Sequence, residues 1–437
     1  MSNEKFQPPK GTRDFLPEEA ILRERVFNSV KNVFERFGFS PAITPSFEYY
    51  EVFANKYAIG EESLKNVYAF EDKSKRKLAL RFDQTVPMAR LVASNSQLPK
   101  PFKRYEISRV WRYEEIKRGR WREFWQCDID IVGSKSMLAD AEIIACTILS
   151  LKELGFSDVF IRLNNRKLLA GLMDYAGIAG NKIIDALRSI DKLDKIGTIG
   201  VKQELKKSNI KQDAIEKIMK VIEIQGKPTE VLSKAEKLIG NNKFGKEGIS
   251  ELREVLEFLN ELEYEENIVV DLSLARGLDY YTSTIFEAMS KDKQIGSLAG
   301  GGRYDEMVGK FAGSKNPIPA VGIALGIERI IELIKDKEER KKSVTKLFVA
   351  NVNDNVKKDC LKIVKTLRDA GINTEIDVMN RDLRKQLEYV NSQKIPYTIV
   401  VGPNELKSKK YKLRNMTTGK EIELGIDDAI KKLGEIR

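Results

Sequence analysis

The first periodic stretch of the chain predicts a long helix over residues 18–37. Its apolar residues recur at intervals of three and four and share one helical face; they are Ile21, Leu22, Val26, Val30, Val33, Phe34 and Phe37. Gly38 follows as a helix stop. Residues 39–47 are strand-like but contain Pro41 and Pro45, and proline within sheets is confined to edge strands and bulges. The pattern therefore predicts a helix that leads into an edge strand.

Two later stretches, residues 78–85 and residues 124–132, alternate with the period of two that is typical of strands. Their polar faces carry Arg81, Asp83 and Thr85 in the first stretch and Phe124, Gln126, Asp128 and Asp130 in the second. Such a face is often the solvated outer side of an antiparallel sheet. An aromatic ring, an amide and two acids on one face also suit a polar ligand, and we favour a ligand site here.

Longer-range patterns divide the chain into domains. The middle is rich in Lys, Glu, Ile and Leu at helical spacing and predicts a helical insertion over residues 169–262. Residues 336–345 are densely charged and predict a linker. Residues 346–437 alternate strand and helix, which indicates a small α/β domain. Residues 1–168 and 263–335 then form one further domain that the insertion interrupts.

Charge points to a class of partner. The chain of 437 residues carries a formal charge of +11. A basic surplus favours a polyanionic partner such as nucleic acid, although a Lys-rich proteome would produce the same surplus. From position 346 onward, 19 basic residues stand against 13 acidic ones, which is more than half of the surplus. Contact with nucleic acid is therefore expected in this last part of the chain.

Three features predict a cytoplasmic protein with no membrane partner. The N-terminus is polar and has no apolar signal segment, and the longest apolar runs are too short to span a bilayer. Cys127, Cys146 and Cys360 are odd in number, scattered and without Cys-x-x-Cys spacing. We interpret them as reduced and structural, and we expect no metal ion held by the chain itself.

The chain contains no histidine. This excludes a Ser-His-Asp triad, a Cys-His pair and a histidine zinc site. Acid–base work near neutral pH must then come from a carboxylate, Lys, Tyr, Cys or the substrate itself.

A basic hairpin is predicted over residues 110–124. Arg112 precedes a charged loop that contains Arg118 and Arg120, and the chain returns to a strand at Phe124. Guanidinium groups at both ends of a hairpin can grip a triphosphate, and an aromatic ring can stack on a base. The alternative is an exposed basic hairpin that contacts RNA or nothing. The chain has neither a Walker loop nor a Gly-x-Gly-x-x-Gly sequence, so those nucleotide sites are not expected.

Residues 274–287 combine a cation with two aromatic hydroxyls. Arg276, Asp279, Tyr280 and Tyr281 lie between two apolar, strand-like runs. A fixed guanidinium beside two tyrosines suits a small ligand with a carboxylate and a polar ring. The alternative is an ordinary hairpin whose tyrosines belong to the core.

Several segments resemble histidyl-tRNA synthetases. The sequence from Arg276 to Tyr281, followed by Thr-Ile-Phe-Glu287, resembles the first histidine-specific motif of that family, and Ala299 to Asp305 resembles the second. Three further segments resemble motifs 1, 2 and 3 of class II synthetases. They occur in that order along the chain, at residues 18–47, 110–124 and 320–330. The likeness extends from Lys10 into the C-terminal domain.

The resemblance implies an α+β catalytic domain with an antiparallel β-sheet, a helical insertion, and a C-terminal α/β anticodon-binding domain. It implies a homodimer built through motif 1. The activity it implies is ATP-dependent ligation of L-histidine to tRNA(His) through a histidyl-adenylate, with ATP bound together with Mg²⁺.

The resemblance also assigns roles to residues by matching position. Arg112 and Arg276 would be catalytic, at the α-phosphate and at the histidine carboxylate. The histidine-binding residues would be Asp83, Thr85, Gln126, Asp130, Arg276, Tyr280, Tyr281 and Tyr304, with Asp130 and Tyr281 on the imidazole nitrogens. The ATP-binding residues would be Arg112, Glu114, Arg120, Phe124 and Arg329, with Arg329 over the adenine.

Rival functions share the implied fold. One is a non-catalytic paralogue that acts as the regulatory subunit of ATP phosphoribosyltransferase, and another is a sensor that binds tRNA without activating an amino acid. The regulatory subunit typically lacks an anticodon domain, whereas this chain has a basic α/β C-terminus and retains Arg112 and Arg276. Another class IIa specificity is disfavoured by the two histidine-specific segments.

Overall fold

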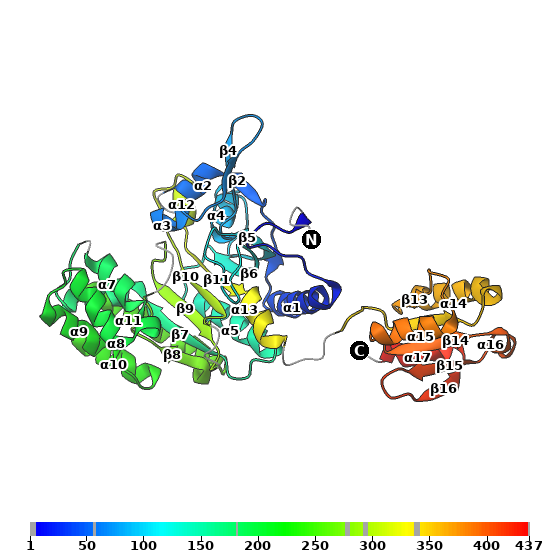
Figure 1. The fold of residues 1–437 in the computed structure, drawn as a ribbon. Coiled ribbons are helices and arrows are strands. Elements are labelled where there is room, and N and C mark those ends of the chain that lie inside the picture. Colours follow the sequence, from blue (N-terminus) through cyan, green and yellow to red (C-terminus); the bar gives the residue numbers. More distant parts are fainter. Residues whose placement is uncertain are drawn as a thin grey trace. The chain divides into compact units, whose positions relative to one another are not determined.

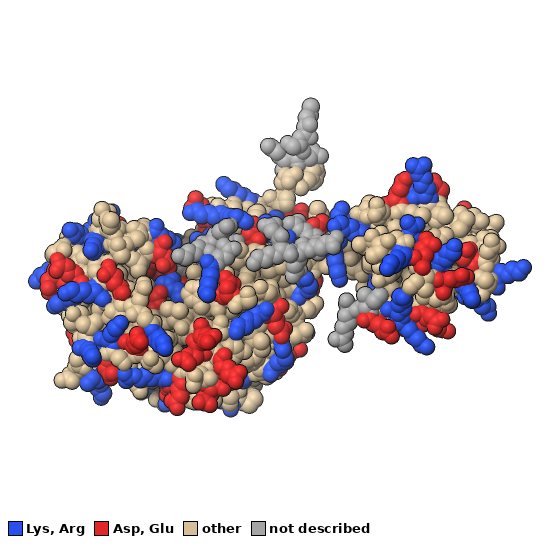
Figure 2. Space-filling model, turned by 90° about the horizontal axis from the view of Figure 1, so that it is seen from below, with Lys and Arg blue, Asp and Glu red and all other residues tan. Residues whose placement is uncertain are grey.

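The computed structural model describes residues 6–55, 58–180, 182–275, 280–291, 296–335 and 341–435. Contacts within the chain divide it into two units, residues 1–13 with 26–336 and residues 14–25 with 337–437; Figure 1 shows the ribbon of each. On the face shown in Figure 2, Lys and Arg lie among Asp and Glu instead of forming one patch. No helix in the described part of the chain is long and apolar enough to cross a membrane.

An eight-stranded sheet organises the first unit, with the strand order β1-β5-β6-β11-β10-β9-β7-β8 (Figure 1). The strands are β1 (Ser40–Pro41), β5 (Phe102–Trp111), β6 (Glu123–Val132), β7 (Phe160–Asn165), β8 (Ile268–Val270), β9 (Thr284–Met289), β10 (Ala299–Arg303) and β11 (Ala320–Gly326). All inner pairs are antiparallel, and only the edge pairs β1–β5 and β7–β8 are parallel. The expected antiparallel sheet is confirmed.

Helices cover the apolar face of this sheet. Helix α5 (Leu138–Glu153) is apolar on nearly every side, which is typical of a helix in the core, and it contacts five strands of the sheet. Helix α1 (Pro17–Arg36) confirms the first predicted helix, and its Phe27 ring lies 4.8 Å from the Trp125 ring of β6. Because side chains alternate along β6, the polar residues next to Trp125 point to the opposite face.

The predicted strands around residues 39–47 and 78–85 are only partly right. Pro41 does lie in an edge strand, but β1 is short, and β2 (Phe47–Tyr49), β3 (Ala69–Glu71) and β4 (Lys77–Leu80) form a separate sheet of order β2-β4-β3. A strand up to Thr85 is wrong, because Thr85 begins helix α4 (Thr85–Ala93). Asp83 Oδ1 accepts a hydrogen bond from Val86 N (3.0 Å), which turns the chain into the helix.

The chain between β7 and β8 is helical, as predicted. Its helices are α6 (Arg166–Tyr175), α7 (Lys182–Ile190), α8 (Leu193–Lys207), α9 (Gln212–Ile222), α10 (Pro228–Ile239) and α11 (Lys243–Glu261). Helix α11 contacts α5, β7 and β9 as well as α6, so part of the insertion packs on the main sheet. Gly171 and Gly245 let α6 and α11 approach closely, since a Cβ on Gly171 would lie 2.8 Å from Gly245 Cα.

The second unit confirms the α/β pattern. Its sheet has the order β13-β12-β14-β15-β16, with β12 (Leu347–Asn351), β13 (Thr374–Ile376), β14 (Tyr397–Val401), β15 (Tyr411–Asn415) and β16 (Glu421–Leu424). The helices on it include α14 (Lys357–Asp369), α15 (Leu383–Ser392) and α17 (Ile426–Glu435). Strands β13, β12 and β14 are parallel, while β15 and β16 add an antiparallel edge that the sequence pattern did not predict.

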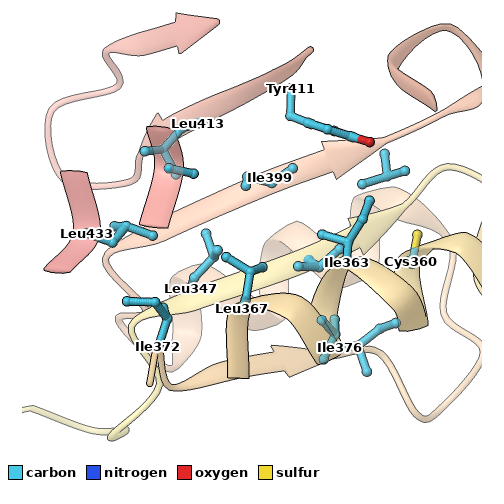
Figure 3. Packing of buried hydrophobic residues seen from close by; sticks show 14 of the residues in the cluster. Leu347, Cys360, Ile363, Leu367, Ile372, Ile376, Ile399, Tyr411, Leu413 and Leu433 are labelled. Carbon is cyan, nitrogen blue, oxygen red and sulfur yellow. The ribbon is translucent and has the colours of Figure 1, made fainter. Parts of the chain in front are cut away.

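Strand β12 faces a core on each side of this sheet. Leu347 and Val349 belong to a cluster with Leu367 of α14, shown in Figure 3. Phe348, which alternates with them, packs with Val390 of α15. Burial on both faces explains why the first four residues of β12, Leu347 to Ala350, form an unbroken apolar run in the sequence.

Candidate active site

A pocket of about 450 Å³ lies against the polar face of the main sheet, beside β6, β9, β10 and β11. Eleven residues expected from the sequence line it: Asp83, Thr85, Arg112, Glu114, Arg120, Phe124, Gln126, Tyr280, Tyr281, Tyr304 and Arg329. The polar face of β6 is therefore a pocket wall, and its Gln126 and Asp128 are buried, in contrast to the alternative of a solvated face.

Two expected residues are placed differently. Arg276 lies outside the described residues. Asp130 is buried just behind the wall, where it accepts a hydrogen bond from the Tyr304 hydroxyl and lies 2.8 Å from Arg104 Nη2. Gly322 of β11 is its cross-strand neighbour and lines the pocket. A Cβ on Gly322 would lie 2.0 Å from Asp130 Oδ1, so only a glycine leaves this carboxylate next to the pocket.

The inner end of the pocket is rich in buried acceptors. Asp83 Oδ2, Gln126 Oε1 and Asp128 Oδ1 are buried and accept no hydrogen bond from the described residues. Buried polar atoms normally have partners, so these three mark the place of a ligand that donates hydrogen bonds. Burial raises the pKa of Asp83 and raises that of Asp128 well above its usual value, against the opposing charge of Arg104. A ligand with a cationic amine would offset the negative charge of these buried carboxylates.

Three tyrosines form the side of this inner end. The Tyr280 ring makes edge contacts with Tyr281 (4.8 Å between centroids) and with Tyr304 (5.7 Å). Burial raises the pKa of all three phenols, so the hydroxyls stay neutral and can donate hydrogen bonds.

The outer end is cationic and belongs to the hairpin between β5 and β6. The Arg112 guanidinium lies between the rings of Phe82 (4.4 Å) and Phe124 (5.2 Å), and its Nε donates to Phe82 O (3.0 Å). Arg120 lies 3.2 Å from Glu114 across the loop. This geometry fixes Arg112 without neutralising it, which suits an anion.

The hairpin loop faces helix α13 (Ile327–Ile334), which follows β11 as predicted. Arg329 Nη1 donates to Ser297 O (2.6 Å), and a Cβ on Gly119 of the loop would lie 3.3 Å from Arg329 Cγ. Arg118 is not among the residues that line the pocket, and it pairs with Glu332 of the same helix at 2.9 Å.

Sequence reasoning missed some of the lining residues. Glu287 and Glu328 line the pocket but were not expected there. Asp128 was expected on the ligand-facing side of β6 and does line the pocket, although no role was assigned to it. Arg81, expected beside Asp83, is instead buried against Glu106 Oε1 at 2.7 Å, because the strand ends before it.

Comparison with known proteins covers both units. The family model described as Histidyl-tRNA synthetase matches residues 11–330, and the one described as Anticodon binding domain matches residues 346–436. A histidine–tRNA ligase of Aeropyrum pernix is 39% identical over 435 residues, which is 99% of this chain and 98% of that protein. The crystal structure of histidyl-tRNA synthetase from Nostoc sp. PCC 7120 is similar with a TM-score of 0.88 at 32% identity, covering 99% of each chain.

A further similar structure concerns a rival function. A protein of Bacillus halodurans C, described as an ATP phosphoribosyltransferase regulatory subunit/histidyl-tRNA synthetase, has a TM-score of 0.74 at 24% identity. It covers 88% of this chain and 96% of its own, and the likeness is one of fold.

Proposed function

The chain belongs to the histidyl-tRNA synthetase family, and we propose that its pocket activates histidine with ATP and passes the histidyl group to tRNA(His). The observation that carries the proposal is the division of one pocket into an inner end of buried carboxylates and tyrosines and an outer end of arginines. An ammonium group with a polar ring fits the inner end, and a polyphosphate fits the outer end. The chain is a histidine–tRNA ligase, an enzyme of translation.

The reaction has two steps. The carboxylate of histidine attacks the α-phosphorus of ATP, pyrophosphate leaves with the bonding electrons, and histidyl-adenylate forms. The 3′-hydroxyl of the terminal ribose of tRNA then attacks the histidyl carbonyl, and AMP leaves. The substrate brings its own nucleophile, so the protein contributes position and charge, which a chain without histidine can supply.

We assign the α-ammonium group of histidine to Asp83, Thr85 and Gln126. Asp83 and Gln126 each keep a buried acceptor atom without a donor among the described residues, and an ammonium group has three donors to offer.

The imidazole ring is assigned to Asp130 and Tyr281, with Tyr280 and Tyr304 completing its pocket. The missing side chain of Gly322 supports this, because it leaves room for a ring beside the Asp130 carboxylate. A carboxylate and a neutral phenol complement the two ring nitrogens. An amino acid without such a ring could not satisfy the hydrogen-bonding positions that face the ring, which is a strong basis for rejecting it.

We assign ATP to the outer end. Arg112 would hold the α-phosphate, Arg120 and Glu114 would order the loop around the nucleotide, and Phe124 and Arg329 would flank the adenine. Mg²⁺ bound with ATP would neutralise phosphate charge, and the lining carboxylate of Glu114 is an oxygen ligand of the kind it prefers. The role of Arg276 on the substrate carboxylate stays a prediction of the resemblance.

We further propose that the chain works as a homodimer in the cytoplasm. Support for the dimer comes from exposed apolar side chains near the motif 1 segment, namely Ile43, Phe47, Tyr49 and Phe70. Support for the compartment comes from the three cysteines, all of them buried and none of them in a disulfide. The basic second unit would meet the anticodon end of the tRNA.

The regulatory paralogue and the tRNA sensor are not favoured. The matched relatives named as ligases extend over both units, and the position of Arg112, held by Phe82 O beside the pocket, supports the proposed phosphate-binding role.

The decisive experiment is ATP–pyrophosphate exchange with each of the twenty amino acids offered separately. We expect exchange with histidine only, followed by charging of tRNA(His). A folded chain that binds histidine but exchanges pyrophosphate with none of the twenty would contradict the proposal and favour a binding paralogue.

A further inference from the structure

Arg162 of β7 stands where the helical insertion meets the main sheet. Its Nε donates to Asp271 Oδ2 (2.7 Å), and its Nη1 donates to Asp194 Oδ2 (2.6 Å). The same Nη1 lies 3.7 Å from Glu287 Oε2. Asp194 belongs to the first turn of α8, whereas Asp271 and Glu287 belong to the sheet region. One guanidinium therefore joins carboxylates of the insertion to carboxylates of the sheet.

The sheet side of this junction is also a wall of the pocket. Glu287 lies directly across from Arg162 in the β7–β9 pair, and it lines the pocket together with Leu274. Both residues also line a small crevice between Arg162 and the connection from α7 to α8. Only 11% of the Arg162 side chain and 6% of the Glu287 side chain are exposed. A displacement of Arg162 therefore reaches the pocket through a direct, buried contact.

Strand β7 also holds the backbone that leads to Tyr280. Three alternating residues, two in β7 and one just after it, donate hydrogen bonds to the segment 271–275. The bonds are Arg162 Nη2 to Ser273 Oγ (3.3 Å), Asn164 Nδ2 to Leu274 O (3.0 Å) and Arg166 Nη1 to Ala275 O (3.4 Å). Ser273 N in turn donates to Asp271 Oδ1 (2.9 Å), which closes the turn on the carboxylate that Arg162 binds. The first of these donors, Arg162, is also the residue that binds the insertion.

On the insertion side of the junction, the carboxylate that Arg162 binds is accessible. The Asp194 side chain is 65% exposed, unlike the groups on the sheet side. Removing its charge would release α8 from Arg162 and leave the buried contacts with Asp271 and Glu287 in place.

We propose that Arg162 is a positioning residue that couples the insertion to the histidine pocket. Binding of histidine in the pocket and packing of α7 and α8 against β7 then favour each other. The inference rests on the proposed function, because histidine is the ligand that fills the pocket. Coupling of this kind is reciprocal. Histidine binding should tighten α7 and α8, and loosening the Asp194 contact should weaken histidine binding.

The test uses the full chain with Asp194→Asn, which keeps the size of the side chain and removes its charge. Asp185→Asn is the matched control, since Asp185 is an exposed acid in the first turn of α7 in the same insertion. Hydrogen exchange of the amides in residues 182–207 is measured with and without saturating histidine, and histidine affinity is measured by calorimetry.

In the wild-type chain and in Asp185→Asn, we expect histidine to slow exchange in α7 and α8. In Asp194→Asn this protection should be lost, and histidine affinity should fall by about two- to five-fold, the range that an ion pair with one exposed partner supports. Asp194→Glu, which restores the charge, should recover most of the protection.

Other outcomes overturn the inference in distinguishable ways. If wild-type chain binds histidine without any change in α7 and α8, or if Asp194→Asn retains the protection, the coupling is wrong while the proposed function stands. If wild-type chain neither binds histidine nor supports histidine-dependent pyrophosphate exchange, both proposals fail together.

Discussion

The inner end of the pocket keeps the carboxylates of Asp83, Asp128 and Asp130 away from water. Burial raises the pKa of each, and the Arg104 guanidinium only partly offsets the cost of ionising them. Groups of this kind are retained for binding at the expense of stability. Asp128 is the clearest case, since its pKa is raised well above the usual value and one of its oxygens has no donor among the described residues.

Asp128→Asn should therefore stabilise the chain at neutral pH. Asp128 ionises near pH 4 in the unfolded chain but only at higher pH in the folded chain, so folding stability falls as the pH rises from about 4 through the raised pKa. An Asn side chain does not ionise, so the variant does not lose this folding stability as the pH rises. We expect the Tm at pH 7 to rise by about 2 °C or more, and the difference to shrink as the pH approaches 4, in calorimetric scans.

The matched control for this experiment is Asp185→Asn, an exposed site where the same change should leave the Tm within about 1 °C. A lower Tm at pH 7 for Asp128→Asn would contradict the argument.

Asp130→Asn separates recognition of the ring from recognition of the nucleotide. A buried hydrogen bond to a charged group is worth about 1.5–3 kcal/mol, so the KM for histidine should rise by roughly ten- to a hundred-fold. The KM for ATP should change by less than about two-fold, because the nucleotide is assigned to the other end of the pocket. Both constants come from pyrophosphate exchange. Similar losses in both would refute the assignment of Asp130 to the imidazole.

The alternation of β6 predicted which of its side chains face the ligand, because a strand fixes the direction of each residue in turn. Alternation also predicted Asp83 and Thr85 in the pocket, and they do line it, but not as strand residues. Asp83 lies in a turn and Thr85 begins a helix. The turn depends on the local hydrogen bond from Val86 N to Asp83 Oδ1, which the alternation does not reveal. Asp130 lies behind Gly322 because β6 pairs with β11, and a local sequence pattern does not predict this long-range contact.

At the scale of elements, the hairpin loop and helix α13 meet through a glycine. Gly119 has a φ of +68°, and its Cα faces Arg329 so closely that a Cβ would lie 3.3 Å from Arg329 Cγ. The loop is also closed by a bridge between Lys117 and Arg120. The hairpin and the helix were both predicted from their sequence patterns, but their closeness depends on the order β6-β11 in the sheet, which those patterns do not define.

Gly119→Ala should weaken ATP binding through Arg329. Gly38→Ala is the control, because Gly38 also has a positive φ (+77°) but no atom within 4 Å of its Cβ position. Both changes should destabilise the chain by about 1–2 kcal/mol through backbone strain. Only Gly119→Ala should raise the KM for ATP, and an equal rise in both variants would show that strain alone is responsible.

At the scale of the whole molecule, charge is the property most relevant to tRNA. The surplus of +11 is not gathered in one patch on the face seen in Figure 2, where acids and bases intermingle. The class of fold and the helical insertion were predicted well, since long periodic segments determine them. The antiparallel edge formed by β15 and β16 was not predicted, because those short strands have mixed apolar and polar residues and depend on pairing for their order.

Salt should therefore separate the two steps of the reaction. The affinity for a polyanion falls with the logarithm of salt concentration, by a slope of roughly 0.7–0.9 for each phosphate contact. Between about 50 and 200 mM KCl, the KM for tRNA(His) should rise steeply, whereas pyrophosphate exchange should change far less, because charges in a buried pocket are screened less. A neutral solute at equal osmolarity is the control. Equal salt sensitivity of both steps would contradict this view of tRNA binding.

The three cysteines lie wholly within the cores, and burial raises the pKa of the Cys360 thiol to about 11 and raises that of Cys146 further. Thiols that reagents cannot reach react slowly with maleimides. Two cysteines introduced on the surface, for example at exposed Ser74 and Ser233, could thus carry a donor and an acceptor fluorophore on an otherwise unaltered chain. Movements of the insertion could then be followed by energy transfer during turnover, without first building a cysteine-free background.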